Sequence, residues 1–234
     1  MNLRLTLSIA ALALSVSTLQ AQPQPNDPKA VLAQLDTASQ HFKNVQAEVK
    51  YDNYTRAVRA DEISTGILYV EHASSGTQMG AIVYDLGPDG KPATTPSKIL
   101  SYDGKTLQIF APGVNQVDVF KAGANQAKYE GFLTLGFGGS GTALAKSWNI
   151  QDQGPETIDG VKTEKLFLTG NDSVTSTFSH VTIWVDPKRG ISLKQVFLAP
   201  NGDMRTATYS NIKLNASINK KPYGISNKAN HINH

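Results

Sequence analysis

The chain has 234 residues, a formal net charge of +3 and no cysteine. Such a small charge argues against nucleic acid as the main partner, because binding to phosphates requires a strongly basic surface. The absence of cysteine excludes disulfides and a lipid anchor attached to a thiol. The fold must therefore be stabilised by packing and hydrogen bonds alone.

Residues 1–21 have the pattern of a secretory signal peptide. Arg4 precedes a mostly apolar run that ends at Leu19, and Ala21 offers a small residue at the cleavage position. The run is interrupted by Ser and Thr and is shorter than the roughly 20 apolar residues of a membrane span. We predict cleavage after Ala21 and, if the protein is bacterial, a periplasmic location. Residues 22–234 contain no linker-like stretch, which predicts a single domain.

The first predicted element after the signal peptide is a helix. Asp27 can cap it, and Pro28 suits its first turn, where a missing N–H costs nothing. Apolar residues then recur at helical spacing from Val31 through Leu35 to Phe42. This pattern indicates one buried helix face.

The remainder of the chain is dominated by β patterns. Runs rich in β-branched and aromatic residues alternate with Gly, Pro, Asn and Asp turns, which predicts one meandering antiparallel sheet of about ten or eleven strands. The tail after Tyr223 is polar and is expected to be frayed. The predicted strands lie within residues 45–51, 63–70, 79–84, 99–112 as a hairpin, 117–120, 163–168, 181–185, 193–198 and 206–212.

One segment, Gln126–Trp148, interrupts the β pattern. It is apolar on nearly all sides and contains several glycines, which predicts short helical pieces that are either buried or form a lid over an apolar ligand. Within it, Gly136–Gly141 fits G-x-G-x-x-G. A dinucleotide site needs a βαβ unit, whereas the flanks predict hairpins, so we interpret the glycines as a flexible connection.

The sequence contains no catalytic constellation. No G-x-S-x-G elbow occurs, and His41, His72 and His180 have no partner at a local spacing. His231 and His234 provide two candidate metal ligands on a loose tail, which makes a poor site. We therefore expect a non-enzymatic protein without a metal or other cofactor.

The hairpin Ile99–Pro112, ILSYDGKTLQIFAP, turns at Asp103-Gly104 and resembles the SDGKTLWFYNP hairpin of the LolA family of periplasmic lipoprotein carriers. Gly66–Val70 is similar to the family's G-x-L-x-V strand, and Asn115-Gln116 to its E-Q pair. The resemblance in pattern extends over residues 27–223. The family's C-terminal F-x-x-P-P ending is missing, with Lys221-Pro222-Tyr223 in its place.

The resemblance implies an unclosed antiparallel β half-barrel with an N-terminal helix and a short helical lid. Its apolar groove would bind the acyl chains of a lipoprotein or lipid, received from an inner-membrane donor and passed to an outer-membrane acceptor. His72 stands where the family typically has an Arg that helps to hold the lid closed. The groove candidates are Leu68, Val70, His72, Leu107 and Ile109 in the wall and Phe132, Leu135, Phe137 and Leu144 in the lid.

Three alternatives stay open at this point. Each candidate apolar residue is at least as compatible with plain core packing. The same fold would also serve a sensory or scaffold domain that recognises an envelope protein. An exported hydrolase with an unrecognised site is the third alternative. We expect a monomer.

Overall fold

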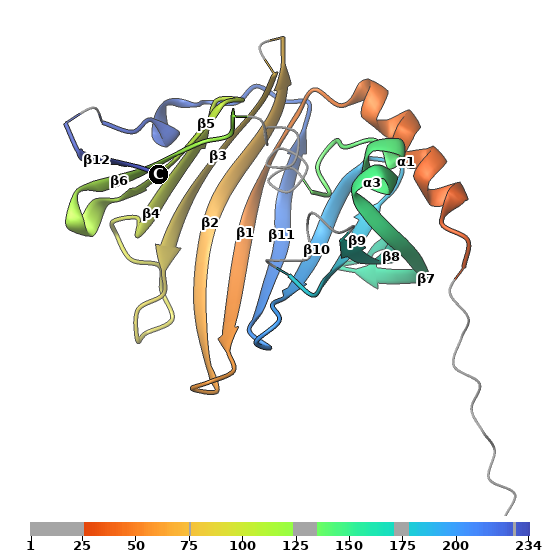
Figure 1. The fold of residues 1–234 in the computed structure, drawn as a ribbon, viewed down its shortest axis with the longest axis horizontal. Helices are drawn as coiled ribbons and strands as arrows, with labels where there is room; N and C mark the ends of the chain where they lie inside the picture. Colours follow the sequence, from red (N-terminus) through yellow and green to blue (C-terminus); the bar gives the residue numbers. More distant parts are fainter. Residues whose placement is uncertain (1–25, 75, 124–134, 171–177, 227) are drawn as a thin grey trace, which may run out of the picture.

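The computed structural model describes residues 26–74, 76–123, 135–170, 178–226 and 228–234 (Figure 1). These residues form one unclosed sheet of 12 strands and two α-helices, consistent with an open half-barrel. The expectation of ten or eleven strands is thus slightly low. The strand order is β12-β6-β5-β4-β3-β2-β1-β11-β10-β9-β8-β7.

The elements have the following bounds. The α-helices are α1 (Lys29–His41) and α3 (Gly141–Ser147), and the 3-10 turns are η1 (Pro112–Val114) and η3 (Lys221–Tyr223). The strands are β1 (Asn44–Thr55), β2 (Ala60–Ala73), β3 (Gly76–Asp85), β4 (Lys98–Tyr102), β5 (Thr106–Ala111), β6 (Gln116–Lys121), β7 (Trp148–Ile158), β8 (Val161–Gly170), β9 (His180–Asp186), β10 (Ile191–Leu198), β11 (Met204–Leu214) and β12 (Asn230–Asn233).

The hairpin at Asp103-Gly104 forms as predicted. Gly104 has a φ of 97°, and Asp103 Oδ1 accepts hydrogen bonds from the backbone N–H groups of Lys105 and Thr106. Asp103 therefore stabilises the turn, and Gly104 supplies the positive φ that it requires.

The sequence did not predict β7 and β12. Gly154-Pro155 inside β7 has the composition of a turn, but β7 is an edge strand and accommodates the pair as a bulge between Asp152 and Pro155. β12 contains Asn and His, which are poor strand formers, yet it pairs in parallel with β6. The expected frayed tail is therefore wrong: backbone pairing and packing order it.

The two faces of the sheet are covered by different parts of the chain. The inner face is the one that carries Leu68 and Val70, and on its β7–β10 half lies α1, whose Val31 and Leu35 pack with Leu166, Leu168, Val181 and Ile183. The outer face carries Tyr69 and Ile82. The C-terminal tail crosses it and buries Tyr223 against these two residues.

Helix α1 starts close to the predicted position. Asp27 Oδ1 accepts a hydrogen bond from the Lys29 N–H, and Pro28 occupies the cap position without a side-chain bond. α3 packs against α1, and its first turn is bound by Asp36, whose carboxylate accepts hydrogen bonds from the N–H and hydroxyl of Thr142. The two helices form one unit at the β7–β10 end (Figure 1).

Candidate ligand-binding site

The inner face of β2–β5 carries continuous apolar rows that follow from strand register. Leu68 lies opposite Ala81, Ala81 opposite Leu100, and Leu100 opposite Ile109. A second row contains Val70, Met79, Tyr102 and Leu107. Directly opposed residues in a sheet share a face, so both rows point to the same side. Gln108 points to the other side, as its place between two apolar residues predicts.

A cavity of about 120 Å³ opens where this surface meets β10 and β11. Most of its wall is apolar. The wall consists of Tyr51, Leu68, Val70, Met79, Ala81, Leu100, Phe137, Phe178, Gln195, Phe197, Arg205, Ala207 and Tyr209.

One wall of the cavity comes from residues 135–140, which we call the strap. Its backbone is bound to the start of β10: the Ser192 N–H donates to the Gly136 carbonyl over 2.6 Å, and the Gly138 N–H donates to the Gly190 carbonyl over 2.9 Å. The strap places Phe137 edge-on to the Tyr209 ring, with 4.8 Å between ring centroids. Phe137 thereby closes one side of the cavity.

The strap needs its glycines because neighbouring side chains pack closely against its backbone, and not because a cofactor binds there. Gly138 has a φ of +72°, and a Cβ added there would lie 2.2 Å from Cδ1 of Phe42. An added Cβ on Gly136 would lie 2.6 Å from Cβ of Ser192. The G-x-G-x-x-G spacing therefore reflects packing against β10 and Phe42, and no βαβ unit accompanies it in the described chain.

Buried polar groups anchor the strap at the cavity wall. The Tyr209 hydroxyl donates to Gln195 Oε1 over 2.8 Å, and Gln195 Nε2 donates to the Leu135 carbonyl. Burial raises the pKa of the Tyr209 hydroxyl well above its usual value. Tyr209 therefore stays neutral and serves as a hydrogen-bond donor, because a phenolate here would lose its hydration.

Arg205 supplies the cationic group of the cavity. Its guanidinium lies over the Tyr51 ring, 4.4 Å from the centroid. The residue is exposed, whereas its neighbour Ala207 is buried in the wall, so Arg205 marks the rim. An apolar cavity with one cation at its rim suits a ligand that has an apolar part and an anionic end.

The eight apolar residues among the predicted groove residues divide into four groups. Leu68, Val70 and Phe137 lie in the cavity wall. Leu107 and Ile109 share the inner face but are half-buried beside the cavity. Leu135 and Leu144 line a separate space of about 360 Å³ next to Trp148. Phe132 lies outside the described residues. Their role in ligand binding stays a prediction.

The segment predicted as a helical lid is only partly helical in the structure, and the proposed role of His72 in holding it stays a prediction. Helical structure is present in α3, but Leu135 and Phe137 lie in the non-helical strap and are buried, at 4% and 3% exposure. The expectation of helix around the glycines is therefore wrong for residues 135–140, because positive φ at Gly136 and Gly138 interrupts it. His72 is exposed at the end of β2, with its ring edge-on to Phe42 at 4.9 Å.

Sequence reasoning missed Gln195, Tyr209 and Arg205. The alternation of faces along β10 and β11 could have placed all three on the inner face. Gln195 is two residues from Phe197, and Arg205 and Tyr209 are each two residues from Ala207, so each shares a face with a buried apolar residue. That the three converge on one cavity depends on strand pairing across the sheet, which the sequence does not show.

We also searched the described residues for metal-ligand clusters and for membrane-spanning helices. Within the described ranges, no cluster of three or more His, Asp or Glu is arranged to hold a metal ion. None of the helices described is long and apolar enough to cross a membrane.

Neither a protein-family model nor a curated protein matches the sequence. Solved structures do match. An uncharacterized conserved protein from Thermus thermophilus superposes with a TM-score of 0.54 at 12% identity, covering 88% of this chain and 98% of that one. This likeness concerns the fold alone.

Two further solved structures match with lower TM-scores. The LolA superfamily protein NE2245 from Nitrosomonas europaea matches with a TM-score of 0.40 and 15% identity, over 84% of this chain and 97% of that chain. The MucA/MucB complex of Pseudomonas aeruginosa matches with a TM-score of 0.48 and 15% identity, over 88% of this chain but 64% of that chain. The solved structures to which this chain is similar thus include a protein named as a LolA superfamily member and a complex named MucA/MucB.

Proposed function

We propose that the protein is an exported, periplasmic carrier that shields an acyl chain of a lipoprotein or lipid in the cavity of the inner face. The observation that carries the proposal is the cavity itself, apolar over most of its wall, with Arg205 at its rim. In a soluble carrier this arrangement would remove a hydrocarbon chain from water while leaving its polar end exposed.

The size of the cavity sets what it can hold. Its volume of about 120 Å³ is comparable to the roughly 150 Å³ apolar cavity that admits benzene. It therefore suits the terminal part of a chain. Each methylene buried contributes about 0.8 kcal/mol, so five methylenes contribute about 4 kcal/mol, a thousandfold in affinity.

Arg205 would bind the anionic end of a fatty acid or the phosphate of a phospholipid. Its stacking on Tyr51 keeps the guanidinium at the rim, and a guanidinium offers five N–H donors in all. Replacement by Gln should weaken binding of a fatty acid about tenfold and leave binding of a neutral chain alcohol unchanged. Arg59→Gln, on the β1–β2 turn and outside the cavity wall, is the matched control.

The direct test uses two neighbouring residues on opposite faces of β4. Leu100 lines the cavity, whereas Ile99 packs beneath the C-terminal tail on the outer face. Both are half-buried, so Leu100→Gln and Ile99→Gln should reduce thermal stability by similar amounts. Titration with a fluorescent fatty acid should show a loss of affinity for Leu100→Gln only. Equal affinities of the two folded variants would refute the proposed cavity.

A partner-recognition role is the second candidate, and one observation favours it. On the outer face of β8–β10, the Trp184 ring lies between the ammonium groups of Lys165 and Lys194, at 5.2 and 4.7 Å from its centroid. Trp is enriched in protein interfaces, and the two ammonium groups give this patch a positive charge that suits an acidic partner. A complex that forms without lipid and is lost on Lys194→Glu would favour this function over transport.

A further inference from the structure

A groove lies outside the inner-face cavity, between α1 and the β9–β10 turn. Its volume is about 520 Å³, larger than that of the cavity. One wall is a stripe of α1 that includes Ala33, Gln34 and Thr37, and the facing wall is formed by Lys188 and Arg189. The α1 residues share a helix face because they are spaced by three and four positions, and the adjacent face, with Val31 and Leu35, is buried in the core. We call this space the basic groove.

Both ends of the basic groove are fixed by contacts within the fold. Asn215 Oδ1 accepts a hydrogen bond from the Lys43 N–H over 2.8 Å, and Asn215 Nδ2 donates to the His41 carbonyl over 3.0 Å. These bonds fasten the end of α1 to the end of β11. At the turn, Gly190 lies so close to Ala38 that an added Cβ would be 3.1 Å from the Ala38 Cβ. The groove is therefore formed before any ligand arrives.

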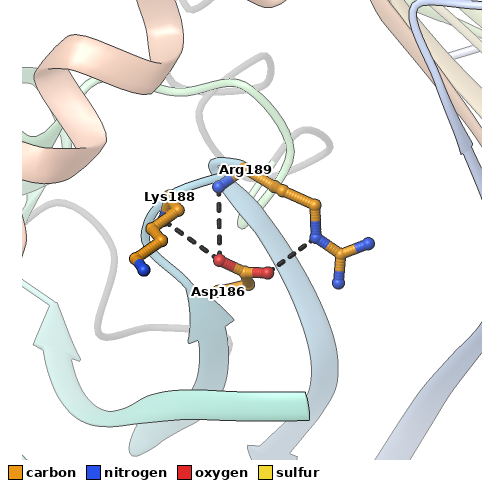
Figure 2. Close-up of polar contacts among 3 residues, drawn as sticks. All are labelled: Asp186, Lys188 and Arg189. Carbon is orange, nitrogen blue, oxygen red and sulfur yellow. Dashed lines mark hydrogen bonds and ion pairs between the residues drawn. The ribbon is translucent and has the colours of Figure 1, made fainter.

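The charge of the groove is arranged by Asp186, shown in Figure 2. Asp186 Oδ1 accepts hydrogen bonds from the N–H groups of Lys188 and Arg189 over 3.0 and 3.2 Å, and Arg189 Nε donates to Asp186 Oδ2 over 2.6 Å. The carboxylate is thus engaged on the turn, and its side chain is 11% exposed. The terminal nitrogens of Arg189 point away from Asp186, which leaves them available as donors (Figure 2).

The described residues that line the basic groove include basic side chains but no acidic ones. Lys188, Arg189 and His41 line the groove, and its described lining contains no carboxylate. Its floor is apolar, formed by Phe42 and Leu214. The C-terminal end of α1 is an unfavourable place for an anion, so a bound anion would depend on the two basic side chains of the turn. An apolar floor beside two cationic side chains matches an amphiphile with an anionic head group.

We propose that the basic groove is a second ligand site, independent of the inner-face cavity, which binds a phosphate head group attached to an alkyl chain. Lys188 and the terminal nitrogens of Arg189 hold the phosphate, and Phe42 and Leu214 contact the first part of the chain. The proposal does not require the inner-face cavity to bind a ligand.

The experiment is a titration of the full mature chain with octyl phosphate, followed by isothermal calorimetry and by ³¹P NMR. Gln34→Glu introduces a negative charge into the groove wall, and Gln40→Glu introduces the same charge on the same helix outside the groove; both residues are exposed. Gln34→Glu and Lys188→Gln should each weaken binding by about fivefold or more, the effect of about 1 kcal/mol, whereas Gln40→Glu should not.

Two further arms identify the source of the affinity. Inorganic phosphate, which lacks the chain, and octyl glucoside, which has the chain but no charge, should each bind much more weakly than octyl phosphate. If inorganic phosphate binds as tightly as octyl phosphate, the groove is a site for a free anion, and the proposal of an amphiphilic ligand is wrong. Equal effects of Gln34→Glu and Gln40→Glu, or binding of octyl glucoside as tight as that of octyl phosphate, would contradict the proposed site. If Leu100→Gln lowers the affinity for octyl phosphate and Gln34→Glu does not, the ligand binds in the inner-face cavity. That result would overturn the proposed second site and support the proposed acyl-chain carrier.

Discussion

The two halves of the sheet bury their apolar residues in opposite ways. The β7–β10 half is covered on its inner face by α1 and α3, and Leu166, Leu168 and Val181 are there completely shielded from solvent. The β2–β6 half is covered on its outer face by the C-terminal tail, and its inner residues Leu100, Leu107 and Ile109 are only half-buried. The difference shows how one sheet can contain both a stable core and an apolar surface that is left for a ligand.

The strap marks the boundary between these halves. Leu135 packs into the core beneath α1, whereas Phe137, two residues later, packs with the residues of the cavity half. A change in the strap should therefore affect both halves, whereas a change within one half should affect stability or binding selectively.

The largest expected effect is in the covered half. Leu168→Ala removes a side chain with 0% exposure and should lower the free energy of unfolding by about 4 kcal/mol, because a cavity is left in a packed core. Leu100→Ala, in the cavity half, should cost about 1 kcal/mol, because the site is already partly open. Urea denaturation measures both. Equal costs would contradict the distinction between the two halves.

The next effect tests the strap. Gly138→Ala should destabilise the protein by about 3 kcal/mol, because the residue needs a positive φ and its methyl group would collide with the Phe42 ring. Gly139→Ala is the control, since an added Cβ there meets no atom within 4 Å. Thermal unfolding of both variants gives the comparison. If Gly138→Ala unfolds at the same temperature as Gly139→Ala, the strap does not pack against Phe42 at Gly138.

A smaller effect is expected where the tail covers the outer face. The Tyr223 hydroxyl accepts a hydrogen bond from Gln46 Nε2 over 3.1 Å, and its ring lies 4.7 Å from that of Tyr69. Tyr223→Phe keeps the ring and should cost about 1 kcal/mol in the free energy of unfolding. Fatty-acid affinity should not change, because the tail lies on the other face. Loss of affinity in this variant would show that the two faces are coupled.

The smallest effect concerns pH at the end of the tail. The hydrogen bond from His234 lowers the pKa of the Asp118 carboxyl below its ordinary 3.8. A lowered pKa stabilises the folded form above the ordinary value, and this contribution is lost as the pH falls through the folded value. Hydrogen exchange of the β12 amides should therefore lose protection when the pH falls below about 4, and His234→Ala should abolish this dependence. Unchanged acid sensitivity in His234→Ala would exclude the pair as its cause.

The sequence predicts most of the strands because their β-branched runs and their turns are local signals. Asp103-Gly104 encodes its own hairpin, and the alternation of Leu107, Gln108 and Ile109 correctly predicts which side faces inward. β12 could not be predicted, because Asn and His form a strand there only through pairing with β6. The cavity was predicted in part: Leu68 and Val70 follow from alternation, whereas Arg205 joins them only through the register of distant strands.

The central claim is that the half-open side of the sheet binds an acyl chain while the covered half does not. Intermolecular NOEs from uniformly ¹³C-labelled laurate to protein methyl groups test it most directly. We expect contacts to Leu68, Val70 and Leu100 in the cavity wall and none to Leu166 or Leu168 beneath α1. Contacts confined to the covered half, or saturating laurate without a contact to any of the cavity methyls, would contradict the account.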